Sequence, residues 1–244
     1  PLHGYENALR SIKESAQKAL ESSELTGVEL ADLTVGAGLA GVNVPKFYEL
    51  MLGWAHPFKH MFLTTDLHIA CLGAHGGKDG AVIVTGTGSC GFSYVNGQMH
   101  SIGGYGFPHG DKGSGAWIGY QAVKYVLESM DGLVVSTQMT TPILEHFGCR
   151  DAIEVVTIVA GQQAGFYARL APLVFQCASQ GDEAARAIVN EGAAYISEMA
   201  RKLGEFNPPH ISIIGGISGV LSEWLDDDVR SSLSPANKPP EVGA

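Results

Sequence analysis

The sequence predicts an α/β protein with two lobes, and three observations support this fold class. Strand-like apolar runs alternate with helical patterns along the first 76 residues, which is typical of βαβ units around a parallel sheet. After Gly76-Gly77 the composition shifts to consecutive strands and then, beyond Gly113, to mainly helical sequence. Both regions contain a strand that ends in a glycine turn, which is compatible with a duplicated nucleotide-binding fold. We therefore predict a first domain at 1–76 and a second at 77–244.

The first region begins with an amphipathic helix. Leu9, Ile12, Ala16 and Leu20 recur at helical spacing with lysines and glutamates between them. The elements predicted after it are a strand within 31–41 that ends in a glycine-rich loop, a helix over 45–55, a strand over 60–66 and a helix over 67–75.

The second region begins with strands and continues with helices. Asn96-Gly97 predicts a hairpin turn. The strands are predicted at 80–86 and within 90–104, and the helices at 114–130, 138–148, 151–159, 161–180 and 182–204. A last strand over 210–216 ends in a glycine pair and leads into a helix that includes Trp224.

Composition excludes several classes of protein. Of the 244 residues, 45% are hydrophobic and 16% charged, so we expect an ordered globular chain. The net charge is −10 and no lysine-arginine cluster occurs, so neither nucleic acid nor an anionic membrane is a predicted partner. The four cysteines show no paired spacing, which favours thiols in a reducing compartment. With no signal-like start and no membrane-length apolar run, we expect a cytoplasmic protein.

The turn Gly86-Thr87-Gly88-Ser89 ends the strand "AVIVT" and presents small and hydroxyl residues at one point. Backbone N–H groups exposed there would suit a phosphate. An ordinary hairpin turn is the alternative.

Asp66 follows a predicted strand and precedes a predicted helix. A carboxylate at the carboxyl edge of a parallel sheet could accept a proton from a substrate hydroxyl. The alternative is that Asp66 only caps the helix. His68, Cys71 and His75 could share one face of that helix, but they lack a fourth ligand, so we predict no metal site.

Two further segments are rich in glycine. Residues 103–119 hold seven glycines, with Tyr105 and Asp111 among them. Such a loop allows close approach of a ligand, so Tyr105 could lie against a sugar face and Asp111 could accept bonds from sugar hydroxyls. A flexible surface loop is the alternative. The pair Gly215-Gly216 would let an adenine or ribose lie close to the main chain, although close helix-strand packing explains it equally well.

Five motifs in this order resemble the BadF/BadG-type ATPase and N-acetylglucosamine kinase family, and within it the bacterial glucosamine kinases. The motifs are "LAG" at 39–41, "TTD" at 64–66, "GTGS" at 86–89, "GGYG…GDKGSGAWIG" at 103–119 and "GGIS" at 215–218. The resemblance implies a two-lobed actin-like ATPase or sugar kinase fold, ribonuclease H-like, with an incomplete first lobe. It also implies an ATP-dependent amino-sugar kinase that phosphorylates the 6-hydroxyl of glucosamine or N-acetylglucosamine.

The resemblance assigns roles to the motif residues. Asp66 matches the catalytic base. Thr87, Gly88 and Ser89 match the second phosphate loop, and Gly215 and Gly216 match the adenosine loop. The residues expected beside the sugar are Tyr105, Asp111, Cys90 and Gly104. Mg²⁺ would arrive with ATP, the partner would be a small sugar, and a homodimer is compatible with the family.

Two departures from the family pattern bear on function. Cys90 stands where the animal enzymes have an asparagine, which leaves the preference for an acetyl group open. The first phosphate loop, Asp-Gly-Gly-Gly-Thr, does not occur in the sequence, so we expect the 244 residues to be part of a longer protein. The alternatives are an ATPase that activates a dehydratase or reductase and a sugar-sensing module without catalysis.

Overall fold

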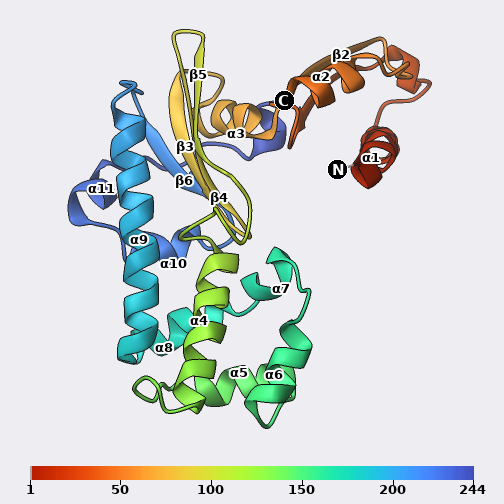
Figure 1. The fold of residues 1–244 in the computed structure, drawn as a ribbon. Helices are drawn as coiled ribbons and strands as arrows, with labels where there is room; N and C mark the ends of the chain where they lie inside the picture. Colours follow the sequence, from red (N-terminus) through yellow and green to blue (C-terminus); the bar gives the residue numbers. More distant parts are fainter. Residues whose placement is uncertain (1) are drawn as a thin grey trace. The chain divides into compact units, whose positions relative to one another are not determined.

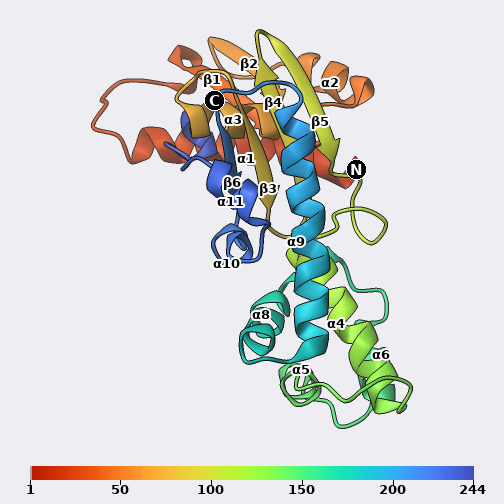
Figure 2. The same cartoon turned by 90° about the vertical axis from the view of Figure 1, so that its left-hand side faces the viewer.

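The computed structural model describes residues 2–244, which form two compact units (Figure 1, Figure 2). The first unit runs up to Lys78 and includes Asn237–Ala244, and the second is Asp79–Ala236. The C-terminal segment therefore differs from the predicted second domain at 77–244. The physical reason is backbone pairing, because the N–H groups of Asn237 and Lys238 donate to the carbonyls of Ala74 and Gly73 in the first unit.

The first unit contains a two-stranded parallel sheet and the helices around it. The register aligns Thr34 with His60 and Leu39 with Thr65, so both strands end at the same edge. The predicted strands and helices are confirmed, with ends shifted by a few residues. The elements are α1 (Leu2–Glu21), η1 (Leu30–Asp32), β1 (Thr34–Leu39), α2 (Pro45–Leu52), β2 (His60–Thr65), α3 (Asp66–His75) and η2 (Pro240–Val242).

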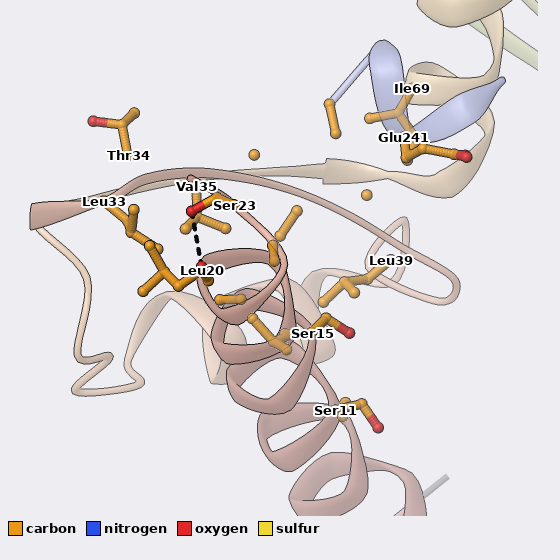
Figure 3. A pocket seen from close by; sticks show the side chains of 18 of the residues that line it. Ser11, Ser15, Leu20, Ser23, Leu33, Thr34, Val35, Leu39, Ile69 and Glu241 are labelled. Carbon is orange, nitrogen blue, oxygen red and sulfur yellow. Dashed lines mark hydrogen bonds between the residues drawn. The ribbon is translucent and has the colours of Figure 1, made fainter. Parts of the chain in front are cut away.

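An apolar groove of about 640 Å³ lies between α1 and β1 (Figure 3). Leu20 of α1 and Val35 and Leu39 of β1 line it, together with Ile69 of α3. Among residues 4–21 of α1 none is fully buried, because the apolar face of the helix borders this groove. None of the predicted site residues lines the groove.

The second unit is built on a four-stranded mixed sheet with the order β5-β4-β3-β6. Its strands β3, β4 and β5 are antiparallel neighbours, whereas β3 and β6 run parallel. The hairpin turn is confirmed, since Asn96 and Gly97 have φ values of 51° and 76°. The strands are β3 (Gly80–Thr85), β4 (Ser89–Val95), β5 (Gln98–Gly103) and β6 (Ile211–Ile214).

Helices form the rest of the second unit. α9 contacts strands β3, β4 and β6 as well as α4 and α8, and Figures 1 and 2 both show α4 and α9 side by side. The helices are α4 (Gly115–Met130), α5 (Thr140–Phe147), α6 (Ala152–Val159), α7 (Ala164–Ala168), α8 (Ala171–Ser179), α9 (Glu183–Gly204), α10 (Ser218–Ser222) and α11 (Asp227–Ser232).

Two helix predictions were wrong in detail. The helix predicted over 161–180 is broken into α7 and α8, because Pro172 has no N–H and its ring clashes with the carbonyl four residues earlier. Trp224 lies beyond the end of α10 at Ser222. The run Asp226-Asp227-Asp228 starts α11 instead, since acidic side chains are stabilised at the beginning of a helix and not at its end.

The second unit has an extensive hydrophobic core. Within it, a glycine of α4 allows α4 and α7 to pack closely. Ile118 and Leu170 are fully buried in this core. A Cβ atom at Gly119 would lie 2.0 Å from the carbonyl oxygen of Tyr167. The close contact of α4 with α7 therefore depends on the absence of a side chain at Gly119.

Gly119→Ala should lower the free energy of unfolding by about 1–3 kcal/mol, because the new methyl group forces the two backbones apart. Gly165→Ala is the matched control, since a Cβ there meets nothing within 4 Å. That change should raise the free energy of unfolding by up to about 1 kcal/mol through helix propensity. Chemical denaturation measures both, and equal stabilities of the two variants would contradict the predicted contact.

Candidate functional site

Asp66 is the first residue of α3, directly after β2. The helix is capped by its neighbour, because Thr65 Oγ1 accepts a hydrogen bond of 3.1 Å from the N–H of His68. The alternative that Asp66 is the N-cap is therefore wrong. The Asp66 side chain is exposed, and among residues 2–244 its Oδ1 accepts a bond only from its neighbour, the N–H of Leu67, over 2.9 Å. A solvent-facing carboxylate at the end of a parallel strand is left available as a proton acceptor.

The helix that follows Asp66 carries the histidines and cysteine considered for a metal. Cys71 is fully buried, and His68 Nδ1 lies 2.8 Å from Thr64 Oγ1. Burial lowers the pKa of His68, which keeps the imidazole neutral. Within residues 2–244 no group of three or more histidine, cysteine, aspartate or glutamate side chains is arranged to hold a metal ion.

The turn Gly86–Gly88 joins β3 to β4 in the second unit. Thr87 is exposed at its tip, and the N–H groups of Thr87 and Gly88 have no acceptor among residues 2–244. The N-terminus of α4 lies against the turn, since the N–H groups of Gly115 and Ala116 donate to the carbonyls of Gly86 and Thr87 over 2.8 and 3.3 Å. Unpaired N–H groups beside a helix N-terminus favour an anion.

The side chain of Ser89, the third predicted residue of the phosphate loop, is directed into the protein. The residue is only 3% exposed, and its Oγ donates a 2.8 Å hydrogen bond to the carbonyl of Lys112. The hydroxyl therefore faces the glycine-rich loop, and the exposed part of the turn is formed by Thr87 and Gly88. The Ser89 carbonyl contacts the same loop by accepting from the N–H of Gly104 over 3.2 Å.

Asp111 lies against the same turn. Its backbone is left-handed, with φ of 61°, and its carboxylate accepts a 3.3 Å bond from the N–H of Gly106. A Cβ at Gly88 would be 2.8 Å from Asp111 Oδ2, so the carboxylate directly contacts the turn. Cys90 lies under Gly104, where a Cβ would approach that of Cys90 to 3.2 Å.

Tyr105 is the exposed member of this loop, with 86% of its surface accessible. The structure thus brings together the predicted residues of the turn with Asp111, Gly104 and Cys90, while the Tyr105 ring faces solvent. The ammonium of Lys112 is directed elsewhere, since it forms an ion pair of 2.8 Å with Glu191 and lies 5.7 Å from the centre of the Trp117 ring.

The second glycine turn adjoins the first. β3 and β6 are parallel, so Thr85 and Ile214 end at the same sheet edge. Gly215 has φ of 114°, and a Cβ there would lie 2.2 Å from the carbonyl oxygen of Thr85. A Cβ at Gly86 would be 3.9 Å from the N–H nitrogen of Gly216. The two glycine turns therefore form one continuous backbone surface.

A groove of about 720 Å³ starts at Gly216 and runs between α8 and the segment around α10. Of its lining, sequence reasoning predicted only Gly216 and missed the residues of α8, because α8 has no glycine motif and lies some forty residues before Gly216 in the chain. Its lining residues are Pro172, Phe175, Gln176, Ser179, Gly216, Ile217, Val220, Glu223 and Trp224.

Two thiols outside this surface are poor ligands. Cys149 and Cys177 are buried and form no disulfide. Burial raises the pKa of both thiols, with nearby carboxylates adding to the shift. They are therefore protonated at neutral pH. Along the described part of the chain, no helix has both the length and the apolar character of a membrane span.

Comparison with known proteins identifies the class of protein. The family model of the BadF/BadG/BcrA/BcrD ATPases matches residues 2–239. A crystal structure from Chromobacterium violaceum, of a candidate N-acetylglucosamine kinase, superposes with a TM-score of 0.87 at 28% identity and covers 98% of this chain and 85% of that one. The fold is thus that of the actin-like ATPases and sugar kinases.

Two relatives with named kinase activities span most of the chain. The glucosamine kinase of Vibrio cholerae serotype O1 is 32% identical over 230 residues, which are 93% of this chain and 77% of that protein. The N-acetyl-D-glucosamine kinase of Dictyostelium discoideum is 29% identical, over 96% of this chain and 77% of that protein. The chain belongs to the BadF/BadG/BcrA/BcrD ATPase family.

Ser89→Ala should loosen the glycine-rich loop, because it removes the bond that holds the Lys112 carbonyl. We expect the free energy of unfolding to fall by about 1 kcal/mol and the amides of residues 104–115 to exchange faster. Ser101→Ala, an exposed serine of β5, is the control. Unchanged exchange in the loop of the Ser89 variant would show that this hydroxyl does not anchor it.

Proposed function

We propose that the protein is an ATP-dependent kinase that transfers the γ-phosphate to the 6-hydroxyl of glucosamine or N-acetylglucosamine. The observation that carries the proposal is the single backbone surface formed by the Gly86–Gly88 turn and Gly215-Gly216, with the Asp111 carboxylate against Gly88. Phosphates would bind at one part of this surface and the nucleoside would extend into the groove at Gly216. The named activities of the two relatives support an amino sugar as acceptor.

The reaction requires a proton acceptor, an oriented hydroxyl and stabilised phosphate charge. Asp66 would accept the proton of the sugar 6-hydroxyl while the oxygen forms a bond to the γ-phosphorus. The bond from that phosphorus to the β,γ-bridging oxygen would break and leave ADP. The N–H groups of Thr87 and Gly88 would donate to phosphate oxygens.

Mg²⁺ would be carried by the phosphates of ATP, where it neutralises charge that develops during transfer. The donor set of the chain fits this arrangement, because the surface offers backbone N–H groups for the phosphates and the carboxylate of Asp111 lies beside Gly88. Asp111, Cys90, Gly104 and Tyr105 would contact the sugar. Because Tyr105 is exposed, its ring would be able to move onto a face of the sugar when the glycine-rich loop closes over the substrate.

Asp66→Asn should lower kcat by about 10² or more, because the amide cannot accept the proton. The KM for sugar should change little. The matched control is Thr65→Ala, which removes the helix cap and should lower the free energy of unfolding by about 1 kcal/mol. A coupled assay of ADP release on the full-length protein measures turnover. Near-normal kcat in the Asp66 variant would exclude this carboxylate as the base.

Asp111→Asn should raise the KM for sugar by about tenfold or more, because a charged acceptor is lost from the bound ground state as well as the transition state. Asparagine is chosen because it tolerates the left-handed backbone at this position. Asp131→Asn, at the exposed end of α4, is the control.

Amide hydrogen exchange gives a second test of whether the glycine-rich loop binds the sugar. Saturating sugar should protect the amides of residues 103–115 in the unmodified protein and protect them less in the Asp111 variant. An unchanged KM together with unchanged protection would remove Asp111 and Tyr105 from the sugar site.

A further inference from the structure

The groove between α8 and α10 has apolar walls and few polar groups. Phe175 and Pro172 come from α8, while Ile217 and Val220 come from the segment that begins at Gly216. Apolar surfaces on two sides suit a flat ring system. A nucleotide whose phosphates met the Gly86–Gly88 turn would have its base in this groove, because Gly216 adjoins that turn.

Gln176 supplies an amide group to this groove. Its side chain is exposed and lines the groove, and its carboxamide forms no hydrogen bond with any of residues 2–244. The bonds recorded for Gln176 outside the regular helix ladder involve its backbone carbonyl, which accepts from Ser179 Oγ over 2.8 Å and from the N–H of Gln180 over 3.1 Å. The carboxamide therefore has both a donor and an acceptor to offer a ligand.

We infer that Gln176 selects adenine over guanine as the base of the phosphate donor. This inference rests on the proposed function. Adenine presents a donor at N6 next to an acceptor at N7, and a carboxamide pairs with both. Guanine presents acceptors at both O6 and N7, so the carboxamide oxygen would face a second acceptor. The class of nucleotide is therefore set by a side chain outside the glycine motifs.

Glu223 is a second polar side chain that lines the groove, and its carboxylate would favour the opposite base. A carboxylate has acceptors only, which suits the N1–H and amino group of guanine. Gln176 is favoured because it lies one helical turn after the groove-lining Pro172 on the same face of α8, and because a neutral amide adds no repulsion to an anionic nucleotide.

The test is Gln176→Leu, with Gln176→Glu as a second variant of nearly unchanged size. We expect the ratio of kcat/KM for ATP to that for GTP to fall about tenfold in both, through a higher KM for ATP at unchanged kcat. Calorimetric Kd values for the two nucleotides should change in parallel. Gln180→Leu, on the residue that follows α8 and outside the groove lining, should leave the ratio unchanged.

Several outcomes would overturn the inference and are distinguishable from failure of the proposed function. An unchanged ratio in both Gln176 variants would exclude this residue as the selector. A ratio that changes only in Glu223→Gln would assign base selection to Glu223 instead. Equal Kd values for ATP and GTP in the unmodified protein would remove the selectivity but leave the kinase, whereas binding of neither nucleotide would overturn the proposed function itself.

Discussion

The parallel pairing of β3 with β6 is the constraint on which the candidate site of the second unit depends. These strands are about 130 residues apart in sequence, yet their carboxyl ends meet at one edge and bring two glycine turns into contact. The contact requires glycine at 215, because any side chain would strike the Thr85 carbonyl and the backbone has φ of 114°. Without this pairing the turn at Gly86 would be an isolated hairpin turn, and the groove would not continue from it.

A second set of contacts fixes the glycine-rich loop of residues 103–115 against the turn at Gly86–Gly88. Many glycines in a loop normally imply mobility. Here the Ser89 hydroxyl holds Lys112, and Gly113 packs on Gly192 of α9, where a Cβ at Gly113 would lie 2.7 Å from the Gly192 carbonyl oxygen. At the start of the loop the N–H of Gly104 donates to the Ser89 carbonyl, so both ends of the loop are anchored while Tyr105 stays exposed. This arrangement restricts movement to a short segment and preserves the turn that it borders.

Local chemistry made much of the fold predictable from sequence. Runs of β-branched residues indicated β3 and β6, and Asn96-Gly97 indicated the hairpin, because these patterns act within a few residues. Pro172 could also have indicated the break between α7 and α8. The return of Asn237–Ala244 to the first unit could not be predicted, because it depends on backbone pairing with Ala74 and its neighbours across the whole chain.

The candidate site was predictable only in part for the same reason. The two glycine turns can be recognised in the sequence, since few residues other than glycine adopt the backbone conformations that they need. Thr65 and Asp66 are both good N-caps, and only the structure distinguishes them, through the bond from the His68 N–H to Thr65 Oγ1. Gln176 carries no local signal at all. Its relevance comes from the position of α8 beside Gly216, which no short motif records.

The electrostatics of the site follow from its reliance on backbone groups. The chain has a net charge of −10, which disfavours the approach of a polyphosphate. The nearby cation, Lys112, is held by Glu191 and the Trp117 ring. Under the proposed function the attraction must therefore come from the N–H groups of Thr87 and Gly88 and from the N-terminus of α4. Such dipoles act only when correctly oriented, so the proposed affinity for phosphate would depend on the bonds from Gly115 and Ala116 that fix the shape of the turn.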